Sequence, residues 1–143
     1  MLAEAFAAAG CTYCDKDDVK EYLKGDEPDT LVLRRSIPHA GAWPGVPEIV
    51  TILEKHSYKA KMVYIFRDQL ATKISATARN RKYPIKFEAI FFAIAELFIR
   101  YGGRLVSYEY FTHSKEYRRN ILESYALNGN IEMEFYDGNE KYY

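Results

Sequence analysis

The segment that most constrains the fold is residues 61–79, KMVYIFRDQLATKISATAR. It predicts a short buried strand at residues 62–66, which ends at Arg67 and Asp68 and leads directly into a helix. Ligands of open α/β sheets bind beyond the carboxyl ends of the strands, so we expect Arg67 to face a binding site. Ser75 follows a little over two helical turns into that helix. The two side chains could hold one phosphate, or Arg67 could pair with a carboxylate while Ser75 lies on a helix surface; their spacing leaves both interpretations open.

Strands alternate with helices along the rest of the chain, which predicts an α/β fold with a mostly parallel sheet. We expect further strands at residues 30–33, 105–108 and 131–135 and helices at residues 2–9, 46–56, 69–79, 84–101 and 114–125, with a short additional helix near residues 17–23. The apolar residues of the long helix, including Phe91 and Phe98, recur at helical spacing and predict a buried face. Gly102 and Gly103 should end this helix.

Length and charge limit the functional classes. A chain of 143 residues favours one domain, spanning residues 1–143, with a core of its own. Twenty acidic residues balance twenty basic ones, so no global field attracts nucleic acid, and a nucleic-acid partner is not expected. Charged residues interrupt the most apolar segment, residues 85–101, so we expect no membrane span. The first residues carry no basic lead of a secretory signal, which favours a cytoplasmic location.

No motif in the sequence predicts a metal site. Cys11 and Cys14 form a single Cys-x-x-Cys, which without a second pair is weak evidence for zinc, and a structural or incidental role is favoured. Asp68 directly precedes a predicted helix, where an N-cap is favoured over a catalytic base or a metal ligand. His56 and His113 lie where helices are expected to end, and we expect structural or exposed roles for them.

Four segments in this order resemble the sulfotransferase family, whose members have a P-loop-type α/β fold and use 3′-phosphoadenosine 5′-phosphosulfate as sulfuryl donor. VYIFRDQLATKIS resembles the family's segment that binds the donor's 3′-phosphate, with Arg67 and Ser75 as the matching residues. LVLRRSIP is similar to the strand that delivers catalytic residues, and LVSYEYF to a late strand followed by a Tyr-Glu pair, here Tyr108 and Glu109. MLAEAFAAAGC resembles the helix that follows the family's phosphosulfate loop. The resemblance implies a three-layer α/β/α domain, a nucleotide donor, no metal and an acceptor hydroxyl whose identity the sequence does not specify.

The same resemblance implies roles for five further residues. Ser36 occupies the position of the family's catalytic histidine, and Arg34 that of a lysine two residues earlier. His39 could instead serve as the base that accepts the acceptor's proton, or be a loop histidine without such a role. Arg34 and Arg35 could stabilise the leaving phosphate oxygen. Lys141, near the C-terminus, could contact the 3′-phosphate or belong to a frayed end.

The chain departs from the family at its start. It begins inside the helix that should follow the phosphosulfate loop, so we expect that loop and its strand to precede Met1 and the domain to be incomplete. Loss of a central strand would leave open strand edges and exposed apolar faces, which predicts marginal stability or self-association. Two alternatives remain: a small P-loop kinase, although no Gly-Lys-Ser/Thr loop is visible, and a non-catalytic remnant or interaction domain of the same fold.

Overall fold

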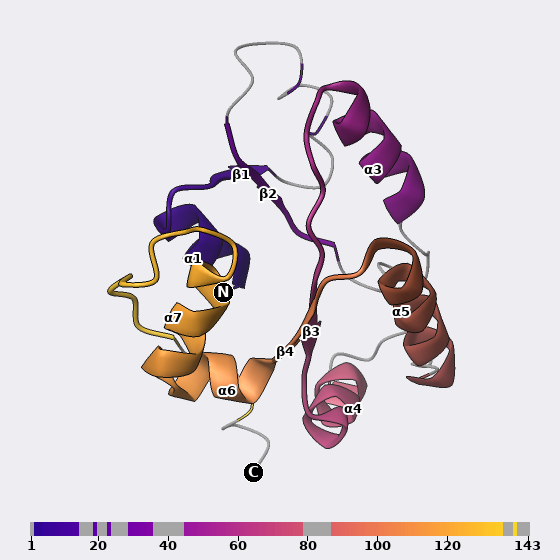
Figure 1. Ribbon diagram of the computed structural model, residues 1–143. Helices are drawn as coiled ribbons and strands as arrows, with labels where there is room; N and C mark the ends of the chain where they lie inside the picture. The colour runs from indigo at the N-terminus through magenta and orange to yellow at the C-terminus, as the bar shows by residue number, and fades with distance from the viewer. Residues whose placement is uncertain are drawn as a thin grey trace. The chain divides into compact units, whose positions relative to one another are not determined.

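The computed structural model describes residues 2–14, 19, 23, 29–35, 45–78, 87–135 and 139. The chain divides into two compact units. The first unit comprises Met1–Ser36 and Tyr110–Tyr136, and the second comprises Ile37–Glu109 and Asp137–Tyr143. Each unit has its own pair of parallel strands (Figure 1). The predicted α/β class with parallel strand pairing is therefore confirmed.

The first unit begins with helix α1 (Leu2–Ala8), built from strong helix formers. Gly10 follows at φ +110°, a left-handed conformation that a residue with a Cβ rarely adopts and that ends the helix as predicted. Strand β1 (Thr12–Cys14) then pairs in parallel with β2 (Leu31–Leu33), so that Thr12 is opposite Leu31. α1 packs against both strands.

Residues 110–113 of helix α6 (Tyr108–His113) and helix α7 (Lys115–Glu123) complete this unit. Ser114 is the N-cap of α7, since its Oγ accepts a hydrogen bond from the Tyr117 N–H at 3.1 Å. Phe111 and Leu122 are fully buried. The ring of Phe111 meets that of Phe135 edge to face with centroids 5.6 Å apart, so the segment after α7 closes over the core.

A buried cation lies inside the first unit. Arg118 is 7% exposed, and its Nη1 donates to the carbonyl oxygens of Phe111 at 2.8 Å and Thr112 at 2.7 Å. These carbonyls belong to the last turn of α6, which attracts positive charge. The guanidinium also lies 4.5 Å from the centroid of the Phe135 ring. Burial lowers the pKa of Arg118, and the two carbonyls compensate for its lost hydration.

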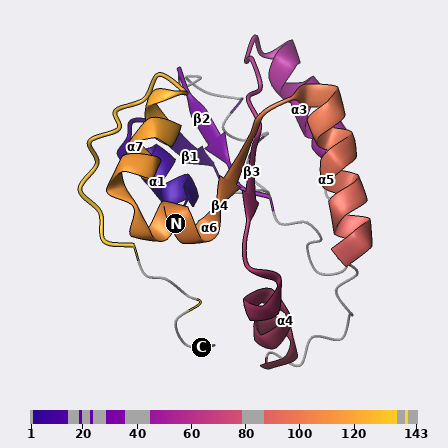
Figure 2. The ribbon, with the colours of Figure 1, turned by 60° about the horizontal axis from the view of Figure 1, so that its bottom comes forward.

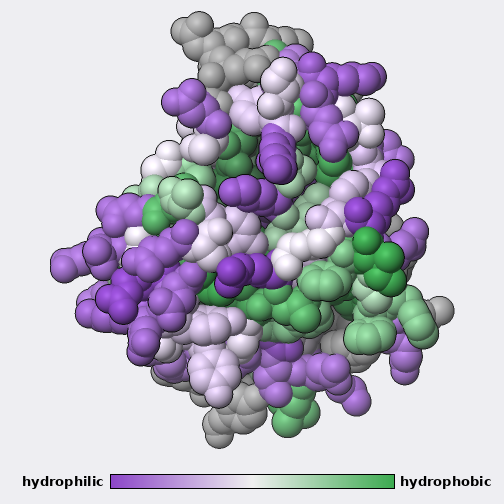
Figure 3. Space-filling model, viewed as in Figure 1, coloured by the Kyte–Doolittle hydropathy of each residue, from purple (hydrophilic) through white to green (hydrophobic). Residues whose placement is uncertain are grey.

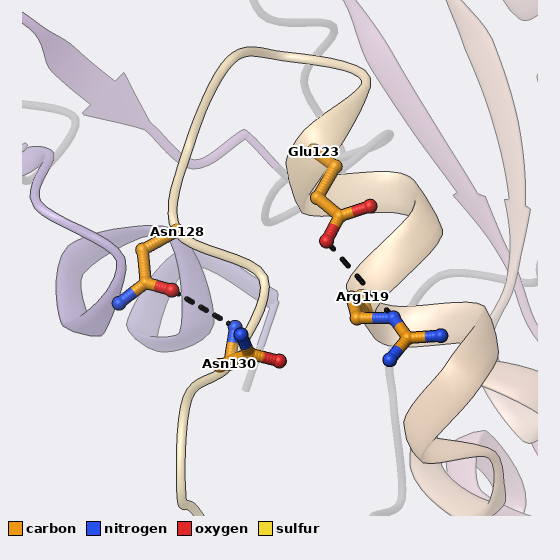
Figure 4. A network of polar contacts seen from close by, with 4 residues as sticks. All are labelled: Arg119, Glu123, Asn128 and Asn130. Carbon is orange, nitrogen blue, oxygen red and sulfur yellow. Dashed lines mark hydrogen bonds and ion pairs between the residues drawn. The ribbon is translucent and has the colours of Figure 1, made fainter.

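The exposed side of α7 has weaker polar contacts (Figure 4). Arg119 and Glu123 form an ion pair at 4.0 Å one helical turn apart, with about half of each side chain exposed. In the following turn, the Asn128 Oδ1 accepts a hydrogen bond from the Asn130 N–H at 3.0 Å. Exposed pairs of this kind stabilise a fold by little, so the buried contacts above hold the unit together.

The second unit contains α3 (Val46–Lys55), β3 (Val63–Phe66), α4 (Gln69–Ala78), α5 (Phe87–Tyr101) and β4 (Arg104–Ser107). β3 and β4 pair in parallel, with Val63 opposite Arg104 and Phe66 opposite Ser107. Gly103, at φ +124°, makes the entry into β4 possible. A Cβ at this position would lie 2.5 Å from the Met62 carbonyl oxygen, so only glycine fits between α5 and the sheet.

Several predicted elements are confirmed within a few residues of their expected ends, namely α1, β2, α3, β3, α4, α5, β4 and α7. Three expectations are wrong. Residues 131–135 are not a strand. Tyr108, expected as the last residue of the strand at residues 105–108, is the first residue of α6. Phe91 and Phe98 are 64% and 39% exposed rather than buried. β1 was not predicted, because three residues in a polar segment carry no strand signal. Of the helix expected near residues 17–23, the structure describes Val19, which is helical, and Leu23, whose N–H donates to the Val19 carbonyl oxygen at 3.2 Å. The start expected at residue 84 lies outside the described residues.

A helix that spans a membrane must be long and apolar enough to cross the bilayer. Among the helices that the structure describes, none has the length and apolar character needed to span a bilayer.

Candidate functional site

Polar residues gather where β3 and β4 end. Arg67 and Asp68 follow β3, Ser107 is the last residue of β4, and Glu109 lies in the first turn of α6. Because the strands are parallel and Phe66 is opposite Ser107, the residues that leave both strands meet at the same end of the pair. All of them belong to the second unit.

Glu109 is the centre of this cluster. Its Oε1 accepts hydrogen bonds from the Asp68 N–H and from the Asn139 Nδ2, each at 2.8 Å, and its Oε2 accepts one from the Ser107 Oγ at 3.0 Å. Burial by itself raises the pKa of Glu109, but hydrogen bonds from the backbone of Asp68 and of Glu109 itself and from these two side chains lower it below its ordinary value. The ionised carboxylate of Glu109 therefore holds the ends of β3 and β4 together by hydrogen bonds. Because its pKa is lowered, it is not suited to accept a proton near neutral pH.

Arg67 is oriented by two contacts. Its Nε donates a hydrogen bond to the Asn139 Oδ1, and its guanidinium lies over the Tyr108 ring at 5.0 Å from the centroid. Asn139 is only 2% exposed and also donates to Glu109. A neutral amide thus links the cation to the carboxylate, and the orientation of Arg67 depends on residues from two other parts of the chain.

Asp68 is the N-cap of α4, as predicted. Its Oδ1 accepts a hydrogen bond from the Ala71 N–H at 2.8 Å, which satisfies one of the backbone donors in the first turn. A cap committed in this way is a poor catalytic base, so the structure favours the structural interpretation of Asp68. The cap also fixes where α4 starts relative to Arg67.

Ser75 lies on the buried face of α4. It is 7% exposed, and Ala71, one turn earlier, is fully buried. The interpretation that Ser75 lies on a helix surface is therefore wrong. Sequence and structure agree that Arg67 and Ser75 lie at the end of one strand and in the second turn of the next helix.

The other candidate residues lie elsewhere. Arg34 and Arg35 follow β2 in the first unit, where the Arg35 Nη1 donates to the Arg34 carbonyl oxygen at 3.0 Å. Arg34 is exposed, and Arg35 is partly buried. Ser36, His39 and Lys141 lie outside the described residues.

Three residues of the cluster, Ser107, Glu109 and Asn139, had no predicted role. Glu109 was noted only as half of a Tyr-Glu pair after a strand, and that pair was the one signal in the sequence that pointed to it. Asn139 had no signal at all, because its partners Glu109 and Arg67 are 30 and 72 residues away in the chain. Such contacts arise from tertiary packing and leave no local pattern.

The described residues include no group of three or more His, Cys, Asp or Glu side chains arranged to hold a metal ion. Cys14 is fully buried in the first unit. Burial raises the pKa of Cys11, an effect that its hydrogen bond with Thr30 partly offsets. His56 is the C-cap residue of α3 and His113 ends α6, the helix-end positions that were expected.

An arginine at a strand end and a serine on the following helix are residue types that suit a phosphate group. The carboxylate in this cluster is occupied by hydrogen-bond donors and orients its neighbours. Comparison of the chain with family models, curated proteins and solved structures finds no match.

Proposed function

We propose that Arg67 and Ser75 bind the 3′-phosphate of a phosphoadenosine nucleotide in a P-loop-type, sulfotransferase-like α/β/α domain. The donor would be 3′-phosphoadenosine 5′-phosphosulfate, and the acceptor a hydroxyl compound. One observation supports this proposal above the others: the cation at the end of β3 is oriented by Asn139 and Tyr108, and a buried serine follows on the next helix.

The residue types suit this ligand. The planar guanidinium of arginine matches two oxygens of a phosphate, and a hydroxyl donates to a third. Both groups project from rigid elements, because Asp68 caps α4 and Glu109 ties the ends of β3 and β4. A site built on fixed elements loses less conformational entropy when the ligand binds.

Sulfuryl transfer requires residues beyond the two that would bind the 3′-phosphate. In sulfuryl transfer the bond between sulfur and the donor phosphate oxygen breaks, a bond from sulfur to the acceptor oxygen forms, and a base takes the acceptor's proton. By resemblance, Arg34 and Arg35 would stabilise the leaving oxygen and His39 would be the base, with Ser36 at the position of the family's histidine. The sequence contains no glycine-rich loop for the phosphosulfate group, so this proposal assigns nucleotide binding to the chain more directly than catalysis.

Calorimetric titration with adenosine 3′,5′-bisphosphate tests the proposal. We expect saturable binding that is stronger than binding of adenosine 5′-monophosphate, which lacks the 3′-phosphate. Arg67→Ala should weaken bisphosphate binding about tenfold or more and remove the preference, and Ser75→Ala should weaken it about two- to tenfold, as losses of a charged and a neutral hydrogen bond predict.

Lys73→Ala is the matched control, because Lys73 is an exposed cation of the same helix. It should leave the affinity unchanged. Absence of heat at millimolar bisphosphate would contradict the proposal, and so would an Arg67→Ala chain that still prefers the bisphosphate. Either result would favour a non-catalytic domain of the same fold. Binding of ATP that depends on magnesium, without binding of the bisphosphate, would instead support the kinase alternative.

A further inference from the structure

Helix α5 carries an apolar surface that the second unit covers only in part, where the Phe98 ring meets that of Tyr64 on β3 with centroids 5.8 Å apart. Phe91, Phe92, Phe98 and Ile99 are 64%, 70%, 39% and 85% exposed, and none of the described side chains at residues 88–101 is buried. One flank of α5 faces away from β3 and β4 in both ribbon views (Figure 1, Figure 2). Hydrophobic residues gather over α5 at the right of the space-filling view (Figure 3). Side chains of this type are normally inside a protein, so their gathering on one helix marks an interaction surface.

The spacing of these residues indicates what covers them. They form two adjacent pairs, Phe91 with Phe92 and Phe98 with Ile99, and the second pair follows the first by seven residues. Ala95 lies between the pairs on the same face, and we call these five residues the α5 stripe. Apolar residues that repeat every seven positions form the seam between two packed helices. The small side chain of Ala95 lets a second helix approach closely at the middle of the stripe.

We propose that the α5 stripe binds the α5 stripe of a second copy of this chain, with the two helices antiparallel about a two-fold axis at Ala95. In this arrangement Ala95 meets Ala95 of the second copy. The Phe91 and Phe92 pair then meets the Phe98 and Ile99 pair of the second copy, because both pairs lie equally far from Ala95 along the helix. A surface that is complementary to itself in this way closes as a dimer and does not extend into a fibre.

The charges at the two ends of α5 favour the same occupant and the same direction. Glu88 lies in its first turn and Arg100 in its last turn. Antiparallel packing brings the first turn of one copy near the last turn of the other, where these charges attract, whereas parallel packing would bring like charges together. An anionic membrane surface fits less well, because Arg100 is the only basic residue of the helix and interfacial helices carry several.

The size of the stripe sets the strength of the contact. Its four large side chains expose on the order of 500 Å² per copy if each has roughly 200 Å² in full. A stable interface buries about 800 Å² per partner, so we expect a reversible dimer whose population rises with protein concentration.

Sedimentation velocity over a range of concentrations tests this dimer. Wild-type chain should shift from monomer to dimer, while Phe92→Glu and Ile99→Glu should remain monomeric with unchanged helical circular dichroism. Leu105→Glu is the control, because it replaces an exposed apolar residue of β4, 56% exposed, outside the stripe. Leu105→Glu should dimerise like the wild type. Wild-type chain that is monomeric at every concentration, or equal loss of association in all three variants, would overturn the proposal.

Cysteine crosslinking tests the geometry. Under mild oxidation, Ala95→Cys should form a disulfide with position 95 of the second copy, identified by peptide mapping because Cys11 and Cys14 are also present. Glu96→Cys, exposed on the flank of the stripe, should form at most a small fraction of that dimer, because its Cβ points away from the axis. Equal crosslinking at both positions would contradict the antiparallel stripe.

Discussion

The two units bury their apolar residues to very different extents. Among the described residues, ten of the buried apolar side chains belong to the first unit and five to the second, while nine of the ten exposed large apolar side chains belong to the second. The first unit closes around Phe111, Leu122 and α1. The second is held at one end by the polar cluster around Glu109 and leaves the α5 stripe open.

This difference in burial suggests different roles for the two units, stability for the first and binding for the second. A unit whose apolar residues are buried stabilises itself, whereas exposed apolar and oriented polar groups are retained where a partner or ligand uses them. We therefore expect the first unit to respond mainly to core substitutions. The second should respond to its ligand, to protein concentration and to pH.

The largest expected effect is in the core of the first unit. Phe111→Ala should lower the free energy of unfolding by about 3–5 kcal/mol, because it removes a fully buried ring and leaves a cavity. Urea denaturation followed by circular dichroism measures this change. Phe92→Ala, at concentrations where the chain is monomeric, is the matched substitution in the second unit and should change stability by about 0.5 kcal/mol or less. Equal losses in both variants would remove the contrast between the units.

Arg118 should have the next largest effect. Arg118→Leu leaves the carbonyl groups of Phe111 and Thr112 buried without their donor, at a cost of about 1–3 kcal/mol for each. Arg119→Leu is the control, since among the described residues the neighbouring arginine is paired on the surface with Glu123 and is half exposed. The same denaturation experiment compares them, and a stable Arg118→Leu chain would show that this buried cation is dispensable.

The two units each contain a helix whose N-cap side chain accepts a backbone hydrogen bond, so the same loss can be compared in both. Ser114→Ala and Asp68→Ala each remove an acceptor for the third N–H of a helix, α7 in the first unit and α4 in the second. Each should cost about 1 kcal/mol. Because α4 carries Ser75, only Asp68→Ala should also weaken binding of adenosine 3′,5′-bisphosphate, which calorimetry measures. Weaker binding in the Ser114→Ala chain would contradict the assignment of the site to the second unit.

The smallest effect should be the pH dependence contributed by Glu109. Its pKa is lower in the folded chain than the ordinary value of 4.5, so its contribution is complete above that value and is lost as pH falls through the folded pKa. We expect Glu109→Gln to be less stable than the wild type near neutral pH, by about 1 kcal/mol or less, and the difference to shrink in acid. Denaturation at several pH values measures it, with Glu116→Gln on α7 as the control for net charge. A difference that grows in acid would contradict the hydrogen-bonded carboxylate.

Local signals in the sequence were sufficient for most elements of the fold. The strand before Arg67, the cap at Asp68 and the stop at Gly103 each depend on residues close in the chain. β1 was missed because its three residues become a strand only through pairing with β2. Residues 131–135 alternate apolar and charged side chains as a strand would, yet Phe135 packs on Phe111 and Arg118 without a partner strand.

The candidate site shows the same division. Arg67 and Ser75 were found from one strand and the helix after it. Of the residues that orient Arg67, Tyr108 was noted only as half of a Tyr-Glu pair, and Asn139 was not found, because it comes from a distant part of the chain and its type is common on any surface. Exposure of Phe91 and Phe98 could not be read from helical spacing, since a buried face and a face that binds a partner have the same pattern.

Hydrogen exchange of the full chain, read by mass spectrometry with and without adenosine 3′,5′-bisphosphate, tests most directly whether the second unit is the binding unit. Bound ligand should slow exchange in peptides covering residues 67–78, which carry Arg67 and Ser75, and leave residues 115–123 of α7 unchanged. Unchanged exchange at residues 67–78 with millimolar ligand, or equal slowing in α7, would contradict a phosphate site at the end of β3.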